Sequence, residues 1–152
     1  MRIEQSIRDT KSCVTFLKQT DFKLSIADLN SLSLPDLTAS CRSCLYAAVA
    51  YSKGKLGKSL AFMKMATSNA GDEEELAYLY HLEGVLFFLM GDSKTAIKRQ
   101  HDCIELCGYI DNGRLKADAL CRLAFIFESV GQKDVARKYE RQAARLLIKR
   151  DL

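Results

Sequence analysis

Gly84-Val85-Leu86-Phe87-Phe88 is an apolar, helix-like run that ends shortly before Gly91, and an amphipathic run follows that glycine. The same arrangement recurs around Gly54 and Gly131. Small residues follow each glycine at two fixed offsets: Ser59, Ala96 and Ala136 come first, and Ala66, Cys103 and Ala143 come seven residues later. Three copies in one register predict helical hairpins that stack into a solenoid, a fold that binds other proteins along a curved face.

The composition of the chain agrees with a helical, globular protein. Its 152 residues fit the size of one domain, 48% of them are hydrophobic, and there is one proline. Few helix breakers and long periodic segments predict an all-α fold.

From the sequence we expect neither a secretory signal nor a membrane span. The longest apolar run, 85–90, is much shorter than the roughly 20 residues that a span requires. Six cysteines without a signal peptide are typical of reduced thiols, so we expect a cytoplasmic location.

The expected organisation is an N-terminal helix with a connector over residues 1–35, followed by three hairpins over 36–152. The first helix is predicted over 3–18, with Ile3, Ile7, Val14 and Leu17 on one side. Ser33 and Asp36 indicate a helix start, and Asp72 with Glu75 forms a second capping box. The hairpins are predicted over 36–68, 73–106 and 115–149. A loop is predicted at 109–113, because the Asn-Gly pair at 112–113 favours a positive φ.

These residues resemble the tetratricopeptide repeat (TPR), a helix-turn-helix unit of about 34 residues. The match consists of close-packing residues, turn glycines and small residues on the second helix: Ala47, Gly84 and Ala124; Gly54, Gly91 and Gly131; and the six small residues given above. The chain departs from the family pattern at its tryptophan, which is replaced by Ser43, Tyr80 and Leu120. The longer spacing resembles the repeats of about 40 residues in bacterial regulatory and adaptor proteins.

The resemblance implies a right-handed α-solenoid of three TPR-like hairpins plus the N-terminal helix, and a non-catalytic adaptor, chaperone or regulator without a cofactor. In the family the first helix of each hairpin lines a concave groove. The corresponding positions here are Cys41, Cys44, Ala48 and Tyr51; Tyr78, His81, Val85 and Phe88; and Asp118, Cys121, Phe125 and Glu128. The implied partner is a peptide or an amphipathic helix, held by Tyr51, Tyr78, Val85, Phe88, Leu89 and Phe125, with His81, Asp118 and Glu128 fixing its orientation.

An apolar groove has alternative explanations. It can be ordinary core, it can be covered by the N-terminal stripe as an internal lid, or it can be a dimer interface. The alternative function is therefore a self-associating or autoinhibited regulatory module, in which residues 1–18 occupy the groove until they are displaced. Glu83 stands at a position where burial requires a partner, and a Lys or Arg of a neighbouring helix is the expected one.

The last predicted helix is the basic part of the chain. Residues 133–150 contain seven Lys/Arg and two acids, a net charge of +5, so that the remainder of the +4 chain carries about −1. Arg137, Arg141, Arg145 and Lys149 form a stripe with four-residue spacing. A solvated outer face is the simplest interpretation and an acidic protein partner is the alternative, whereas nucleic acid requires a broader positive field.

Cysteine spacing suggests a thiol or metal sensor as a weaker alternative. Cys41 and Cys44 have CxxC spacing, but no second pair with zinc-ligand spacing accompanies them, and buried small hydrophobic residues are the simpler interpretation. Catalysis is not expected, because two histidines and no glycine-flanked nucleophile offer little for hydrolase chemistry.

Overall fold

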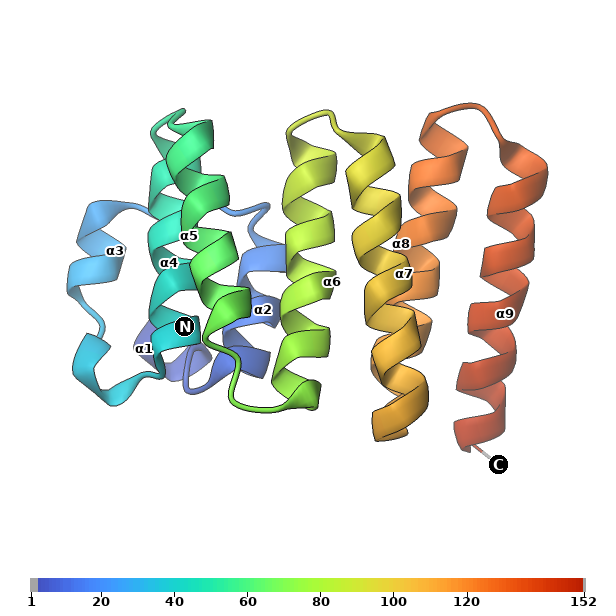
Figure 1. The fold of residues 1–152 in the computed structure, drawn as a ribbon, viewed down its shortest axis with the longest axis horizontal. Coiled ribbons are helices and arrows are strands. Elements are labelled where there is room, and N and C mark those ends of the chain that lie inside the picture. Colours follow the sequence, from blue (N-terminus) through green and yellow to red (C-terminus); the bar gives the residue numbers. More distant parts are fainter. Residues whose placement is uncertain (1–2, 152) are drawn as a thin grey trace. The chain divides into compact units, whose positions relative to one another are not determined.

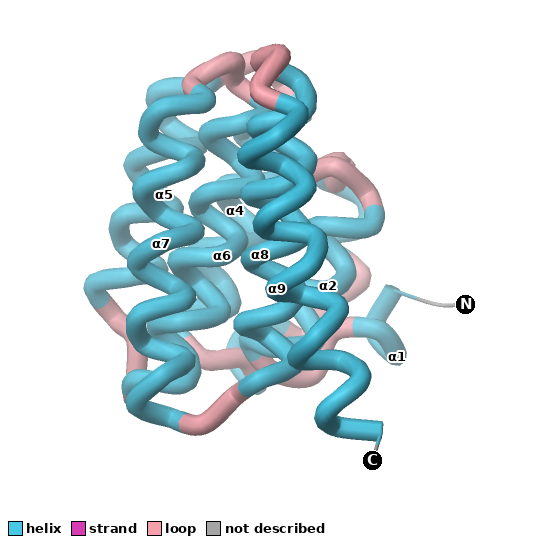
Figure 2. The backbone as a smooth tube through the Cα atoms, turned by 90° about the vertical axis from the view of Figure 1, so that its right-hand side faces the viewer, coloured by secondary structure: helices cyan, strands magenta, loops and turns pink. Residues whose placement is uncertain are grey.

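The computed structural model describes residues 3–151, which form helices, turns and loops without any strand. The all-α prediction is therefore confirmed for this part of the chain (Figure 1). The helices are α1 (Ile3–Ser6), α2 (Thr10–Gln19), α3 (Ile26–Asn30), a 3₁₀ turn at Leu34–Asp36, α4 (Ala39–Ser52), α5 (Leu56–Ser68), α6 (Glu73–Leu89), α7 (Ser93–Ile110), α8 (Gly113–Ser129) and α9 (Lys133–Asp151). Figure 2 shows that short loops and turns join them.

Internal contacts divide the chain into two units, Met1–Leu82 and Glu83–Leu152, so that the boundary falls within α6. In the first unit α4 and α5 pack as an antiparallel hairpin that turns at Gly54. The small residues predicted for the crossing are fully buried there: Ser59 donates a hydrogen bond from Oγ to the Ala47 carbonyl oxygen at 2.7 Å, and Ala66 accepts one from Ser40 Oγ at 2.8 Å. Short side chains let the two helices approach closely, and their hydroxyls use the spare backbone acceptors.

The N-terminal segment differs from the prediction, because the single helix expected over 3–18 is broken at residues 7–9. Asp9 starts a new helix: its Oδ1 accepts from the Ser12 backbone N–H at 2.8 Å, and Ser12 Oγ accepts from the Asp9 N–H at 3.0 Å. This reciprocal capping box satisfies donors that a continuous helix would have used internally.

The start of the first hairpin also lies later than predicted. Ser33 and Asp36 do interact, with Ser33 Oγ donating to Asp36 Oδ2 at 2.7 Å, but they frame only the short 3₁₀ turn. The helix α4 begins at Ala39, where Thr38 accepts a hydrogen bond from the Cys41 N–H at 3.2 Å. Asp72 caps α6 as predicted through the Glu75 N–H at 2.8 Å.

The second unit contains the C-terminal part of α6 together with α7, α8 and α9. Gly91 and Gly131 turn the chain with φ values of 86° and 83°, and Gly54 has 75°, so the glycines at all three predicted turns occupy the left-handed region. The helices α8 and α9 pack along one another, and Ala136 and Ala143 on α9 are buried as the repeat pattern requires.

The junction between α7 and α8 corrects the loop predicted at 109–113. The helix α7 continues to Ile110, and Asp111 rather than the Asn-Gly pair takes the positive φ, at 53°. Asn112 instead caps α8 by accepting from the Leu115 N–H at 3.0 Å. Short polar side chains tolerate the left-handed conformation, as Asp111 does, and cap helix ends, as Asn112 does. These two residues therefore connect α7 to α8 without a longer loop.

Candidate protein-interaction surface

In the first unit, the predicted groove face of α4 is covered by the N-terminal segment. Cys41, Cys44 and Ala48 are completely buried. Cys13 Sγ on α2 donates a weak hydrogen bond to the Cys41 carbonyl oxygen at 4.0 Å, and the rings of Phe22 and Tyr51 meet edge to face with centroids 6.2 Å apart. The α4 face is thus part of a packed interior.

Backbone hydrogen bonds fix this N-terminal segment in place. The Leu24 N–H donates to Ser52 Oγ at 2.9 Å, and Ser52 Oγ donates to the Phe22 carbonyl oxygen at 3.2 Å. Leu17 and Phe22 have no exposed surface. A segment that contributes fully buried large side chains and paired backbone groups belongs to the core of its unit.

The groove residues of the first part of α6 are largely enclosed too. Tyr78 is half-buried, and Lys11 Nζ lies 5.9 Å from its ring centroid, a distance that allows a cation–π contact. His81 is fully buried, so its imidazole is not presented to solvent as the sequence prediction requires of an orienting residue.

The second unit presents its predicted groove residues differently. Phe125 on α8 is 56% exposed, whereas Val85 is 2% exposed. Phe88, near the end of α6, is half-buried and contacts Phe125 edge to face, with ring centroids 5.4 Å apart and an interplanar angle of 72°. Leu89 is half-buried, and Glu128 lies exposed beyond them on α8.

The packing of α8 explains why Phe125 is left in solvent. Buried residues on this helix face α7 and α9 and anchor it: Leu115, Ala119, Leu120, Leu123, Ala124 and Ile126. Asp118, Cys121, Phe125 and Glu128 follow one another at spacings of three and four residues, so they share the remaining face. Among them Asp118 is half-buried and the other three are exposed. We call Phe88, Leu89, Phe125 and Glu128 the α8 patch.

Glu83 has the cationic partner expected from the sequence. Arg99 of α7 donates from Nε to Glu83 Oε1 and from Nη1 to Asp102 Oδ2, the latter at 3.0 Å. Burial by itself lowers the pKa of Arg99, but the charge and hydrogen bond of Glu83 and then the contact with Asp102 raise it above its ordinary value. The pair neutralises a glutamate that is 7% exposed.

The basic stripe lies on the exposed side of α9. Arg137, Arg141, Arg145 and Lys149 are all exposed, and Arg137 Nη1 lies 3.9 Å from Asp134 Oδ1. On the same helix two apolar side chains are also exposed, Ile148 at 62% and Leu147 at 38%.

Five of the six cysteines form two buried groups, and Cys121 is exposed. Cys13, overlooked by the CxxC argument, joins Cys41 and Cys44, and hydrogen bonding to these two thiols together with burial raises the pKa of Cys13 well above its ordinary value. On α7, a hydrogen bond with Cys103 lowers the pKa of Cys107 against the opposing effect of burial. Within residues 3–151 no cluster of three or more His, Cys, Asp or Glu side chains could hold a metal ion.

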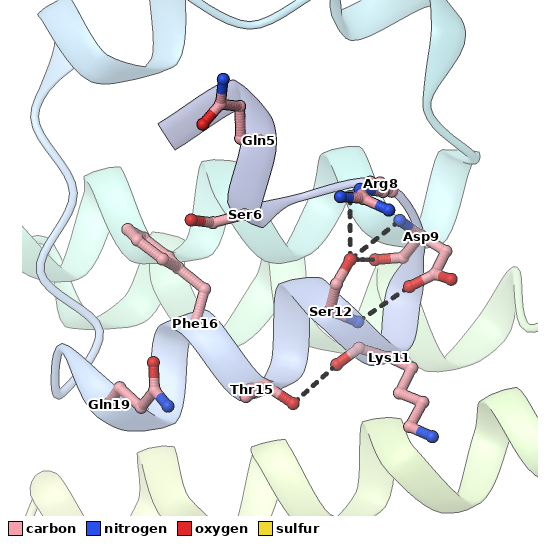
Figure 3. A pocket seen from close by; sticks show the side chains of 9 residues that line it. All are labelled: Gln5, Ser6, Arg8, Asp9, Lys11, Ser12, Thr15, Phe16 and Gln19. Atoms are coloured by element: carbon pink, nitrogen blue, oxygen red, sulfur yellow. Dashed lines mark hydrogen bonds between the residues drawn. The ribbon is translucent and has the colours of Figure 1, made fainter. Parts of the chain in front are cut away.

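A polar pocket of about 440 Å³ lies along α1 and α2, where the sequence analysis had not placed a site. Figure 3 shows Ser12 among its lining residues, with Oγ accepting from the Arg8 N–H at 2.8 Å and from the Asp9 N–H at 3.0 Å. Thr15 Oγ1 donates to the Lys11 carbonyl oxygen at 3.1 Å. Asp9 and Ser12 satisfy each other's polar groups here, which is the chemistry of a helix cap.

Comparison of the chain with family models, with curated proteins and with solved structures gives no match. In the part of the chain that the structure describes, no helix is both long and apolar enough to cross a membrane.

Proposed function

We propose that this chain is a non-catalytic protein–protein interaction module, a right-handed α-solenoid of three TPR-like hairpins. Its α8 patch binds a peptide or an amphipathic helix of another protein. The observation that carries the proposal is Phe125, a large aromatic side chain that remains 56% exposed on a helix where Leu120, Leu123 and Ile126 are buried.

Burial of Phe125 by a partner would contribute a substantial part of a binding free energy. A phenylalanine buries roughly 200 Å² when it is fully enclosed. At 56% exposure about 110 Å² can still be removed from water, which at about 25 cal/mol per Å² corresponds to at most about 2.8 kcal/mol. Ordering of the partner offsets part of this, so that a ten- to hundredfold contribution to affinity is a reasonable expectation.

The arrangement of the patch favours an amphipathic ligand. Phe88 supports Phe125 from the side, and this leaves the Phe125 ring as the anchor for an incoming apolar side chain. Glu128 lies one helical turn beyond Phe125 on the same face and is exposed. A ligand that places Lys or Arg one turn away from its apolar anchor would gain a charge-assisted contact with Glu128.

The N-terminal segment does not suit the role of a displaceable lid. Leu17 and Phe22 are fully buried in the first unit, and the Leu24 and Ser52 hydrogen bonds tie the segment down. Displacing it would expose core rather than a preformed groove. Deletion of residues 1–18 should therefore cause unfolding, seen as loss of helical circular dichroism, instead of increased ligand binding.

The proposed function is tested by selecting amphipathic helical peptides from a displayed library and measuring their affinities for substituted proteins. Phe125→Arg should weaken the selected peptides by at least about tenfold. Tyr109→Arg is the matched control, because Tyr109 is 75% exposed, lies on α7 and receives the same added charge. Failure to select any peptide, or equal affinity for wild type and Phe125→Arg when both remain helical, would refute the proposal.

A further inference from the structure

The outer face of α9 carries a regular row of positive charge. Arg137, Arg141, Arg145 and Lys149 are exposed and stand four residues apart. Four residues of helix rise about 6 Å, so the row runs along most of α9 with nearly even spacing. Residues 133–150 have a net charge of +5, while the rest of the chain is close to neutral.

This row lacks the intramolecular neutralisation found on a neighbouring helix. On α7, Lys98 Nζ lies 3.7 Å from Asp102, and Arg99 bonds both Asp102 and Glu83. On α9, the described residues give Arg137 a contact of 3.9 Å with Asp134, which is itself 97% exposed, and no ion pair to Arg141, Arg145 or Lys149. The charges on α9 therefore remain available to an external anion.

Apolar side chains at the end of α9 argue for a protein rather than a lipid surface. Ile148 is 62% exposed and Leu147 is 38% exposed, whereas Ala136 and Ala143 are buried and Tyr139 and Leu146 pack against the cluster of Ala117 and Leu120. A helix that lies in a membrane interface inserts its apolar face, and the apolar face of α9 is already occupied by the protein. Leu147 and Ile148 beside the charged row instead resemble the mixed apolar and polar composition of a protein–protein interface.

We propose that the outer face of α9 binds an acidic helix of a partner protein, one that carries Asp or Glu at every fourth position. Such a helix repeats its carboxylates at the same interval of about 6 Å as the row on α9, so several charge pairs form at once. An apolar residue at one end of the partner would cover Ile148. Nucleic acid fits less well, because the positive field is confined to one helix.

The experiment uses two helix-forming peptides of about 20 residues with identical composition, titrated against the full chain at about 50 and about 200 mM salt. In one peptide the acids stand at every fourth position, and in the other at every fifth, which distributes them around the helix. The first peptide should bind at least about tenfold more tightly, and its affinity should fall with salt.

Paired charge reversals locate the binding site. Arg141→Glu with Arg145→Glu should weaken the first peptide by at least about tenfold, because two attractive contacts become repulsive. Lys55→Glu with Lys58→Glu makes the same change in net charge on exposed residues of the first unit and should leave the affinity unchanged. Circular dichroism checks that both variants keep the helical content of the wild type.

Three results would overturn the proposal. The first is equal affinity for the two peptides, and the second is equal loss in the two charge-reversed proteins. The third is tighter binding of vesicles containing phosphatidylserine, or of single-stranded DNA, than of the first peptide under the same conditions.

Discussion

Gly84 offers a direct test of the close approach between α6 and α7. A Cβ atom at this position would lie 2.5 Å from Gln100 Nε2, 3.0 Å from Gln100 Cδ and 3.2 Å from the Ala96 carbonyl oxygen. Gln100 is fully buried, so its amide cannot swing into solvent to make room. The substitution Gly84→Ala must therefore shift a packed side chain and a helix backbone.

The expected change in unfolding free energy combines two opposing effects. Replacing a helical glycine by alanine stabilises a helix by about 0.5–1 kcal/mol. Overpacking of a tight interior costs about 1–3 kcal/mol. We expect Gly84→Ala to be destabilising by about 1 kcal/mol, and Gly84→Leu by more.

Gly108 is the matched control, because it too lies within a helix, α7, and a Cβ atom there meets nothing within 4 Å. Gly108→Ala should stabilise the protein by up to about 1 kcal/mol. For a chain of this size 1 kcal/mol shifts the melting temperature by about 2–4 °C, so the two variants should move in opposite directions.

Urea denaturation followed by circular dichroism measures both variants, and a third protein tests the cause. In the Gln100→Ala background, Gly84→Ala should lose most of its cost, since the nearest two atoms are removed. The reasoning is refuted if Gly84→Ala stabilises the protein as much as Gly108→Ala does.

Further expectations concern the buried ion pair, the thiols and the first helix cap. Arg99→Met should destabilise the protein by about 1–3 kcal/mol, because Glu83 is 7% exposed and would lose its arginine partner. Glu83→Gln should lower the unfolding free energy by less, and equal losses in urea denaturation would contradict this. A thiol reagent should react rapidly with Cys121, which is exposed, and with the five buried thiols only on unfolding; a fast phase that persists in Cys121→Ser would contradict this. A hydrogen bond from the Ser12 backbone N–H lowers the pKa of Asp9 below its ordinary 3.8. The stabilisation by this cap is therefore complete at neutral pH, and it is lost as the pH falls through the pKa that Asp9 has in the folded protein. Asp9→Ala should accordingly cost about 0.5–2 kcal/mol at pH 7 and much less at strongly acid pH, and a cost independent of pH would argue against the cap.

Much of the local structure could be read from the sequence because it depends on local chemistry. Glycine is the residue that enters the left-handed region without steric cost, so Gly54, Gly91 and Gly131 predicted their turns correctly. The break before α2 also had a local signal, since Asp9 and Ser12 have the spacing of a capping box. The apolar stripe from Ile3 to Leu17 instead favoured a continuous helix.

The candidate site was less accessible to sequence reasoning. The repeat register placed Ala48, Val85 and Phe125 at equivalent positions. Periodicity therefore predicts that all three side chains line the groove. Their exposures are 0%, 2% and 56%. Periodicity identifies which side of a helix is apolar, and it contains no information about what covers that side.

The sequence by itself determined where the chain is helical, where it turns and which small residues allow helices to approach, because these depend on backbone conformation and side-chain volume. The tertiary structure alone decided that Leu17 and Phe22 fill the space beside α4 while Phe125 on α8 keeps more than half of its surface in water. Burial depends on segments that are distant in the chain. The residue type of a hydrophobic side chain therefore does not tell whether it packs in a core or lies exposed at a binding surface.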